Sequence, residues 1–222
     1  MKNNIAAFNS TEYDDKIKRT LPYYEEFYRQ VIDLIKSYNS QSLSWLDIGC
    51  GTGKMADVAF KELNIKKFVC CDCSSDMIEI AKKRFNRSNV MFLTSDVREI
   101  DFENEFDIIT AIQVNHYLHD QEREISIKKC YQALRTGGLF ITFENFAPFS
   151  EFGEHLYLER WKAYQLEQGK NEKECECHIN RYNTKYFPIS LSKHFELLKE
   201  CGFITIEILW LSYMQVGIWG IK

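Results

Sequence analysis

Hydrophobic positions along the chain follow two periods, which predict strands and helices in alternation. Short runs that are apolar throughout predict buried strands at residues 42–48, 68–71, 90–93, 106–112 and 139–143. Between these runs, apolar residues recur at steps of three and four, which is typical of amphipathic helices. Strands that are apolar on both faces and alternate with helices indicate a mainly parallel sheet covered by helices. The predicted fold class is therefore α/β.

The two ends of the chain and one irregular stretch complete this pattern. Residues 8–38 predict helical structure, residues 190–201 a further helix, and residues 203–220 a closing hairpin. Residues 144–187 are rich in aromatic and charged side chains and predict one helix plus a mobile segment, inserted as a cap. We expect a single domain over 1–222, divided into N-terminal helices (1–41), a ligand-binding core (42–143), the cap (144–189) and a C-terminal helix with its hairpin (190–222).

Composition narrows the partners that this domain could have. Of 222 residues, 45% are hydrophobic, enough for a folded core, and the 32 acidic residues outnumber the 28 basic ones. An acidic chain disfavours nucleic acid as a partner. No apolar run is long enough to span a membrane and no secretory signal is present, so we expect a cytoplasmic protein with reduced cysteines. Cys175, Cys177 and His178 lack the spacing of a zinc site, and we expect no metal.

A glycine-rich loop at residues 49–53 joins the first predicted strand to the next helix. Glycines at such a junction let the backbone turn sharply and approach a ligand closely. The spacing does not fit a nucleotide phosphate loop, in which Ser or Thr would replace Met55. A dinucleotide loop would have a third glycine where Lys54 stands, so an NAD(P)-dependent oxidoreductase is an alternative that this loop disfavours. Asp47 favours a cationic ligand such as S-adenosylmethionine over a pyrophosphate.

The next two strands also end in acidic residues. Asp72 ends the second strand, at the distance from the glycines where a carboxylate accepts hydrogen bonds from ribose hydroxyls. Asp96 ends the third strand, where its side chain can reach an adenine amino group, and Met77 and Val97 can enclose the purine between apolar surfaces. In open α/β sheets ligands bind at this edge. The ordered series therefore predicts a site for an adenosyl compound.

Residues 46–112 resemble the class I S-adenosylmethionine-dependent methyltransferases. The resemblance covers the glycine loop, the acidic end of strand two, the Ser95-Asp96-Val97 step and the start of strand four. It implies a Rossmann-like sheet of seven strands with the final strand antiparallel, and S-adenosylmethionine as cofactor with S-adenosylhomocysteine as product. Carried over by position, it implies these cofactor contacts: Asp47, Gly49, Cys50, Gly51, Asp72, Cys73, Met77, Asp96, Val97 and Gln113.

A narrower resemblance lies in residues 19–24, Arg-Thr-Leu-Pro-Tyr-Tyr. They are similar to a stretch of the carboxy-S-adenosylmethionine synthases in which the last tyrosine touches the cofactor, which would make Tyr24 a cofactor contact. A buried tyrosine on an amphipathic helix is the alternative. Those synthases also carry an arginine for the extra carboxylate, and the sequence does not single out its counterpart in this chain. Synthesis of a modified cofactor is therefore the alternative to methyl transfer.

We expect the molecule that accepts the methyl group to bind between the end of strand four and the cap. His116 is the candidate general base, because imidazole titrates near neutral pH, with a purely structural histidine as the alternative. His116, Tyr117, Trp161 and Tyr164 form the predicted substrate pocket. We expect a small, partly apolar or aromatic acceptor enclosed under the cap, and leave a homodimer open.

Overall fold

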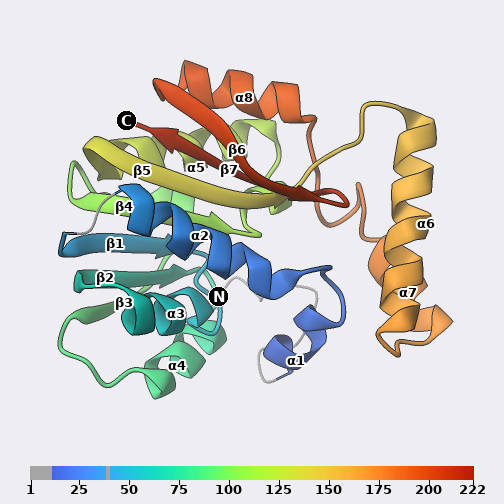
Figure 1. Ribbon diagram of the computed structural model, residues 1–222, viewed down its shortest axis with the longest axis horizontal. Helices are drawn as coiled ribbons and strands as arrows, with labels where there is room; N and C mark the ends of the chain where they lie inside the picture. The colour runs from blue at the N-terminus through green and yellow to red at the C-terminus, as the bar shows by residue number, and fades with distance from the viewer. Residues whose placement is uncertain (1–11, 39–40) are drawn as a thin grey trace.

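A computed structural model describes residues 12–38 and 41–222, and within them one seven-stranded sheet organises the chain (Figure 1). Its order is β3-β2-β1-β4-β5-β7-β6, with β7 antiparallel to both of its neighbours and the pairs from β3 to β5 parallel. This confirms the predicted α/β class and the final antiparallel strand. The strands are β1 (Leu43–Ile48), β2 (Ile65–Asp72), β3 (Val90–Thr94), β4 (Phe106–Ile112), β5 (Leu134–Asn145), β6 (Thr205–Ser212) and β7 (Gln215–Ile221).

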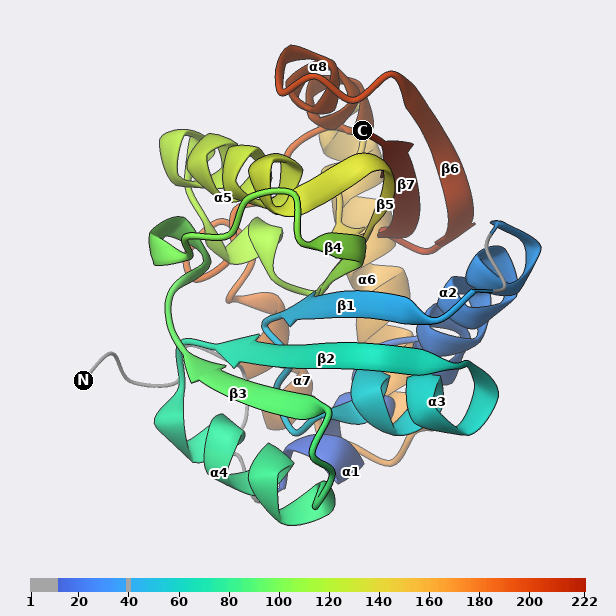
Figure 2. The same ribbon diagram turned by 90° about the vertical axis from the view of Figure 1, so that its left-hand side faces the viewer.

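Helices cover both faces of the sheet. The helices are α1 (Tyr13–Lys18), α2 (Tyr24–Tyr38), α3 (Lys54–Glu62), α4 (Ser75–Arg84), α5 (Asp120–Ala133), α6 (Glu151–Glu167), α7 (Glu172–Ile179) and α8 (Leu191–Glu200), with short 3₁₀ turns η1 (Val97–Glu99) and η2 (Asn115–Tyr117). Helices α2, α3 and α4 share one hydrophobic core with the sheet, and α5 and α8 share the other. Figure 2 shows α5 and α8 separated by the sheet from α2 and α3.

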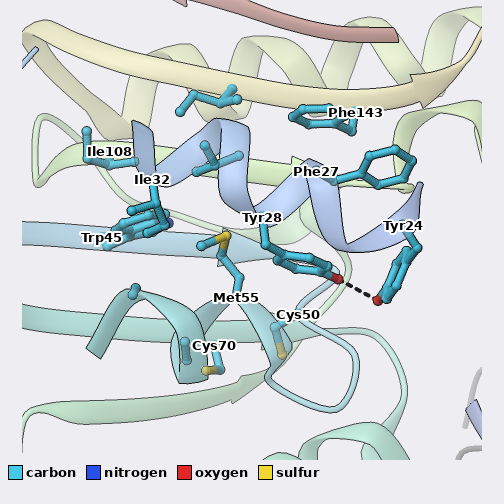
Figure 3. Packing of buried hydrophobic residues seen from close by; sticks show 14 of the residues in the cluster. Tyr24, Phe27, Tyr28, Ile32, Trp45, Cys50, Met55, Cys70, Ile108 and Phe143 are labelled. Carbon is cyan, nitrogen blue, oxygen red and sulfur yellow. Dashed lines mark hydrogen bonds between the residues drawn. The ribbon is translucent and has the colours of Figure 1, made fainter. Parts of the chain in front are cut away.

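Burial on both faces explains why these strands are apolar throughout. Every residue of β1 is buried; Trp45 packs in the core that contains α2, and Leu46 packs in the core that contains α5. On the first of these faces the Trp45 ring stacks on Phe68 of β2, with ring centroids 5.4 Å apart. Helix α2 adds Phe27, whose ring stacks on Phe143 of β5 (Figure 3). Aromatic contacts therefore join the central strands to one another and to α2.

Three predicted elements differ from the structure. The N-terminal helix is broken into α1 and α2 by a turn around Pro22; the part of the prediction at residues 8–11 lies outside the described residues. Strand β5 begins at Leu134 and not at residue 139 as predicted; Gly137, in this additional part of the strand, donates its N–H to the carbonyl of Lys222. The expected mobile segment contains helix α7, which begins with a capping box formed by Asn171 and Glu174.

Helices α6 and α7, together called the cap here, stand beyond the carboxyl ends of the central strands, with α1 beside them (Figure 1). The cap is tied to the segment after α1. Trp161 Nε1 donates to the carbonyl of Thr20 at 2.6 Å, and the Arg19 guanidinium donates to the carbonyls of Gln168 and Gly169. No helix in the described part of the chain is both long and apolar enough to cross a membrane.

Candidate active site

The glycine loop between β1 and α3 requires glycine for two different reasons. Gly49 has φ +62°, and a Cβ there would lie 2.4 Å from Cγ2 of Val114 in the loop after β4. Gly51 has φ +54°, and a Cβ there would meet no atom within 4 Å. Gly49 therefore lets two loops pack together, whereas Gly51 leaves an open backbone surface for a ligand.

Asp72 at the end of β2 is fixed by the backbone around it. Its Oδ2 accepts from the N–H of Gly51 at 2.9 Å, and its Oδ1 accepts from the N–H of Ser74 at 2.8 Å. Burial raises the pKa of Asp72, and these two hydrogen bonds oppose that shift. Each carboxylate oxygen retains a further lone pair that can accept from a ligand hydroxyl.

A cavity of about 480 Å³, called the donor cavity here, opens above these residues. Eight of the predicted cofactor contacts line it: Gly49, Gly51, Asp72, Cys73, Met77, Asp96, Val97 and Gln113. Met77 and Val97 are both buried, on α4 and η1, so the cavity has apolar side chains near Asp96. The series of strand ends that the sequence suggested therefore meets at one cavity.

Asp96 has a more constrained environment than Asp72. Both of its carboxylate oxygens accept from the Arg98 guanidinium, at 2.8 Å and 2.6 Å, and Arg98 is also paired with Glu122. The proposed contact of Asp96 with an adenine amino group stays a prediction. Because the Arg98 guanidinium already donates to both carboxylate oxygens, a ligand that binds Asp96 would share this carboxylate with Arg98.

Asp47 lies on the other side of the glycine loop. It is buried at the end of β1, and its Oδ1 accepts from the hydroxyl of Thr110 at 2.6 Å. Burial raises the pKa of Asp47 to about 7; the Thr110 hydrogen bond opposes this shift, and the nearby Asp72 adds to it. Asp47 lines a cavity of about 30 Å³ together with Cys50 and Tyr24. Tyr24 is also buried, and its hydroxyl lies 2.5 Å from that of Tyr28 (Figure 3).

The charges around these two cavities suit a cationic adenosyl ligand. Asp47 and Asp72 flank the glycine loop. Among the described residues that line the two cavities, the basic side chains are Arg98, which is paired with Asp96 and Glu122, and Lys54, which is paired with Glu25. A pyrophosphate placed here would meet carboxylates without a free cation. An ammonium and sulfonium ligand would find its counter-charges at Asp47 and Asp72, and its ribose would find acceptors at Asp72.

Three of the four predicted substrate-pocket residues meet in a second cavity beneath the cap. His116, Tyr117 and Trp161 line this cavity of about 20 Å³, called the inner chamber here. Tyr164 does not line it, because its hydroxyl donates to the carbonyl of Lys18 and its ring packs against Tyr213. The remaining lining residues are Tyr13, Ile17, Leu21, Gln113, Asn145, His178 and Tyr186.

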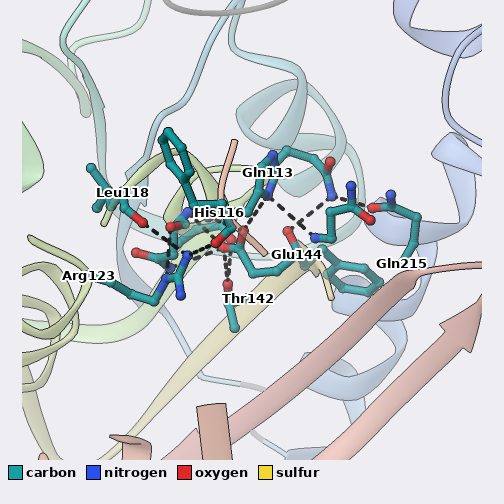
Figure 4. A network of polar contacts seen from close by, with 12 residues as sticks. Gln113, His116, Leu118, Arg123, Thr142, Glu144 and Gln215 are labelled. Carbon is teal, nitrogen blue, oxygen red and sulfur yellow. Dashed lines mark hydrogen bonds and ion pairs between the residues drawn. The ribbon is translucent and has the colours of Figure 1, made fainter. Parts of the chain in front are cut away.

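Glu144 is a residue of this site that the sequence analysis did not single out. Its Oε2 lies 2.7 Å from Nδ1 of His116 and accepts from the His116 N–H, while its Oε1 accepts from Asn115 and Thr142 (Figure 4). Burial would raise the pKa of Glu144, but these hydrogen bonds and the neighbouring His116 outweigh it and lower the pKa. Because Glu144 comes near the end of β5, the rule that pointed to Asp72 would also have found it.

Comparisons with known proteins agree with this geometry. The family model described as "Methyltransferase domain" matches residues 46–138. The carboxy-S-adenosyl-L-methionine synthase of Helicobacter hepaticus is 27% identical over 210 residues, which cover 90% of this chain and 87% of that protein.

Two solved structures share the fold. A protein of Methanococcus maripaludis, provisionally assigned as an S-adenosyl-L-methionine-dependent methyltransferase, has a TM-score of 0.67 at 18% identity and covers 100% of this chain and 97% of its own. A phosphoethanolamine N-methyltransferase of Haemonchus contortus, in complex with S-adenosylhomocysteine, has a TM-score of 0.63 at 20% identity, with 90% and 44% covered. Residues 46–138 are thus similar to a methyltransferase domain, and the whole chain has the fold of S-adenosylmethionine-dependent methyltransferases, which use S-adenosylmethionine as cofactor.

Proposed function

We propose that the protein transfers a methyl group from S-adenosylmethionine to a small molecule held beneath the cap. The observation that carries the proposal is the relation between the two cavities. Tyr13, Gln113 and Tyr117 line both the donor cavity and the inner chamber, so the two sites share a wall at the carboxyl edge of the sheet. A donor and an acceptor bound in these cavities would be neighbours, which is what direct group transfer requires.

The residues of the chain contribute binding, orientation and exclusion of water. Asp72 and the backbone of Gly51 hold and orient the nucleoside, and Asp47 provides a carboxylate for the amino group. When bound, S-adenosylmethionine supplies an electrophilic methyl group on a sulfonium sulfur. The cap, fastened through Trp161 to the segment after α1, excludes water from the place where the acceptor would react.

Synthesis of a carboxylated cofactor is the second candidate, because the synthase of Helicobacter hepaticus and a second one, from Nautilia profundicola, match this chain over most of its length at 27% identity. The extra carboxylate of such a product would need a cationic partner. Among the described residues lining the donor cavity the basic side chain is Arg98, whose guanidinium already pairs with Asp96 and Glu122. The donor cavity therefore fits an unmodified sulfonium better.

Two measurements test the proposal. Isothermal titration of the purified protein should show binding of S-adenosylhomocysteine and no binding of NADH; the reverse result would favour an oxidoreductase. Mass spectrometry of the ligand that co-purifies with the protein should find S-adenosylmethionine or S-adenosylhomocysteine. A co-purified ligand heavier by one carboxyl group would instead establish the second candidate.

A further inference from the structure

The small cavity that Asp47, Cys50 and Tyr24 line, called the tail pocket here, adjoins the donor cavity. The two cavities have five lining residues in common: Tyr13, Gly49, Gly51, Ile112 and Gln113. A ligand in the donor cavity can therefore extend past the glycine loop into the tail pocket. The volume of the tail pocket, about 30 Å³, admits about two groups of the size of a water molecule, such as the two oxygens of a carboxylate.

Among the described residues that line the tail pocket, one is acidic and one is basic. Asp47 provides a buried carboxylate, and Lys54, the first residue of α3, provides an ammonium group. The Lys54 side chain is 24% exposed, and its Nζ lies 5.8 Å from the centre of the Tyr28 ring, which lines the same pocket. An α-amino acid group has an ammonium and a carboxylate on one carbon, so the two charges of the pocket are complementary to it.

Lys54 already binds a carboxylate of the chain itself, that of Glu25 at the start of α2. Its Nζ lies 3.0 Å from Oε2 of Glu25, and Oε1 of the same carboxylate lies 2.9 Å from Nζ of Lys18 at the end of α1. Burial would raise the pKa of Glu25, but hydrogen bonds from Lys18 and Lys54 outweigh it and lower the pKa. One carboxylate thus serves two ammonium groups. The Glu25 side chain is 53% exposed and does not line the tail pocket, so it can turn toward solvent while Lys54 stays in place.

We infer that Lys54 selects donors that carry an α-carboxylate, and that this carboxylate replaces Glu25 at the Lys54 ammonium group. The inference rests on the proposed methyl transfer, because it requires an adenosyl donor in the donor cavity. Exchange of one carboxylate for another keeps Lys54 paired in both states, and Glu25 retains its ion pair with Lys18, so no charge is left buried and unpaired. A donor without the carboxylate leaves the Lys54–Glu25 pair intact and gains nothing from Lys54.

The first test compares two nucleosides that differ only in the α-carboxylate. The purified protein is titrated calorimetrically with S-adenosylhomocysteine and with its decarboxylated analogue, S-adenosyl-3-thiopropylamine. We expect S-adenosylhomocysteine to bind about tenfold more tightly, the contribution of about one hydrogen bond between charged groups. The two proposals fail differently: a protein that binds neither nucleoside contradicts the proposed function, whereas equal affinities, or tighter binding of the analogue, contradict the role of Lys54.

Matched lysine variants locate the preference for the carboxylate. Lys54→Met removes the ammonium group from the tail pocket and should reduce the preference for S-adenosylhomocysteine over the analogue to about twofold or less. Lys18→Met is the control, because Lys18 pairs with the same Glu25 but lines neither the donor cavity nor the tail pocket; it should keep the preference. A preference that survives in Lys54→Met, or falls equally in both variants, would overturn the inference.

The exchange itself is tested at Glu25, with Lys54 intact. Glu25→Gln removes the carboxylate that competes with the ligand, so the preference for S-adenosylhomocysteine over the analogue should rise by about threefold. Glu26→Gln, the neighbouring glutamate on α2 that pairs with Arg29, is the control and should leave the preference unchanged. An unchanged or smaller preference in Glu25→Gln would show that the ligand does not replace Glu25, and would overturn the inference.

Discussion

The donor cavity and the inner chamber share Tyr13, Gln113 and Tyr117, yet they are built in different ways. The donor cavity is wide and assembled from loops that follow β1, β2, β3 and β4, which are held by backbone hydrogen bonds and by the carboxylates of Asp72, Asp96 and Glu144. The inner chamber is small and assembled from α1, η2, the end of β5 and the cap, which are far apart in the sequence. One site is thus fixed by the sheet, while the other exists only if the cap and α1 are in place.

This difference predicts which substitutions the protein tolerates. The site fixed by the sheet depends on single carboxylates and glycines, so individual substitutions there should act strongly and locally. The chamber depends on several helix contacts that each contribute little.

The largest effect is expected for Asp72→Ala. This variant loses the two hydrogen bonds that shape the loop and the acceptor for the ribose, so affinity for S-adenosylhomocysteine should fall by roughly 100-fold. Titration calorimetry measures the loss. Asp96→Ala should lose less, about tenfold or below, because Arg98 already binds that carboxylate. Asp101→Ala, an exposed site outside the cavity, serves as the control; equal losses for Asp72 and Asp96 would contradict the distinction drawn between them.

Gly49→Ala should destabilise the fold by about 3 kcal/mol. The new methyl group would collide with Val114, and alanine is strained at φ +62°. Urea unfolding measures the change. Adding Val114→Ala should recover the part of the lost stability that the collision causes, but not the part that backbone strain at residue 49 causes. A double variant no more stable than Gly49→Ala would show that the two loops do not press on each other.

Cofactor affinity should depend on pH through Asp47. Below pH 7 this carboxyl takes up a proton and loses its charge, so binding of S-adenosylhomocysteine should weaken by roughly tenfold at one pH unit below the pKa. The stability of the ligand-free protein should depend on pH in the opposite direction. A raised carboxyl pKa contributes stability at low pH, and this stability is lost as the pH rises toward 7. Asp47→Asn should bind weakly with a flat profile from pH 6 to about 8; an unchanged slope would assign the titration to another group.

The smallest effect concerns the cap. Arg19→Ala removes two hydrogen bonds to the turn between α6 and α7 and should cost at most about 1 kcal/mol. Limited proteolysis between Gly169 and Lys173 should nevertheless become faster, because local opening needs less free energy than unfolding. Arg29→Ala, which removes an exposed ion pair on α2, is the matched control. Equal cleavage rates in both variants would mean that Arg19 does not hold the cap.

The same contrast explains how much could be predicted from the sequence. Asp47, Asp72 and the glycine loop follow strands whose apolar runs are unmistakable, and the topology of a parallel sheet brings such strand ends together. Helix α7 and the closed cap depend on contacts with Thr20 and Arg19, across about 150 positions of the chain, which no local pattern records. Glu144 was missed for a simpler reason: the predicted fifth strand stopped at residue 143, so the residue was assigned to the cap.

The position of β7 has a consequence for how the protein is made. Although it comes last in the described chain, this strand lies inside the sheet, bonded on one side to β5 and on the other to β6. During synthesis β6 has no strand to pair with until residues 215–221 have left the ribosome. The half of the sheet that carries the glycine loop can assemble co-translationally, whereas closure of the other half must wait for release of the final strand.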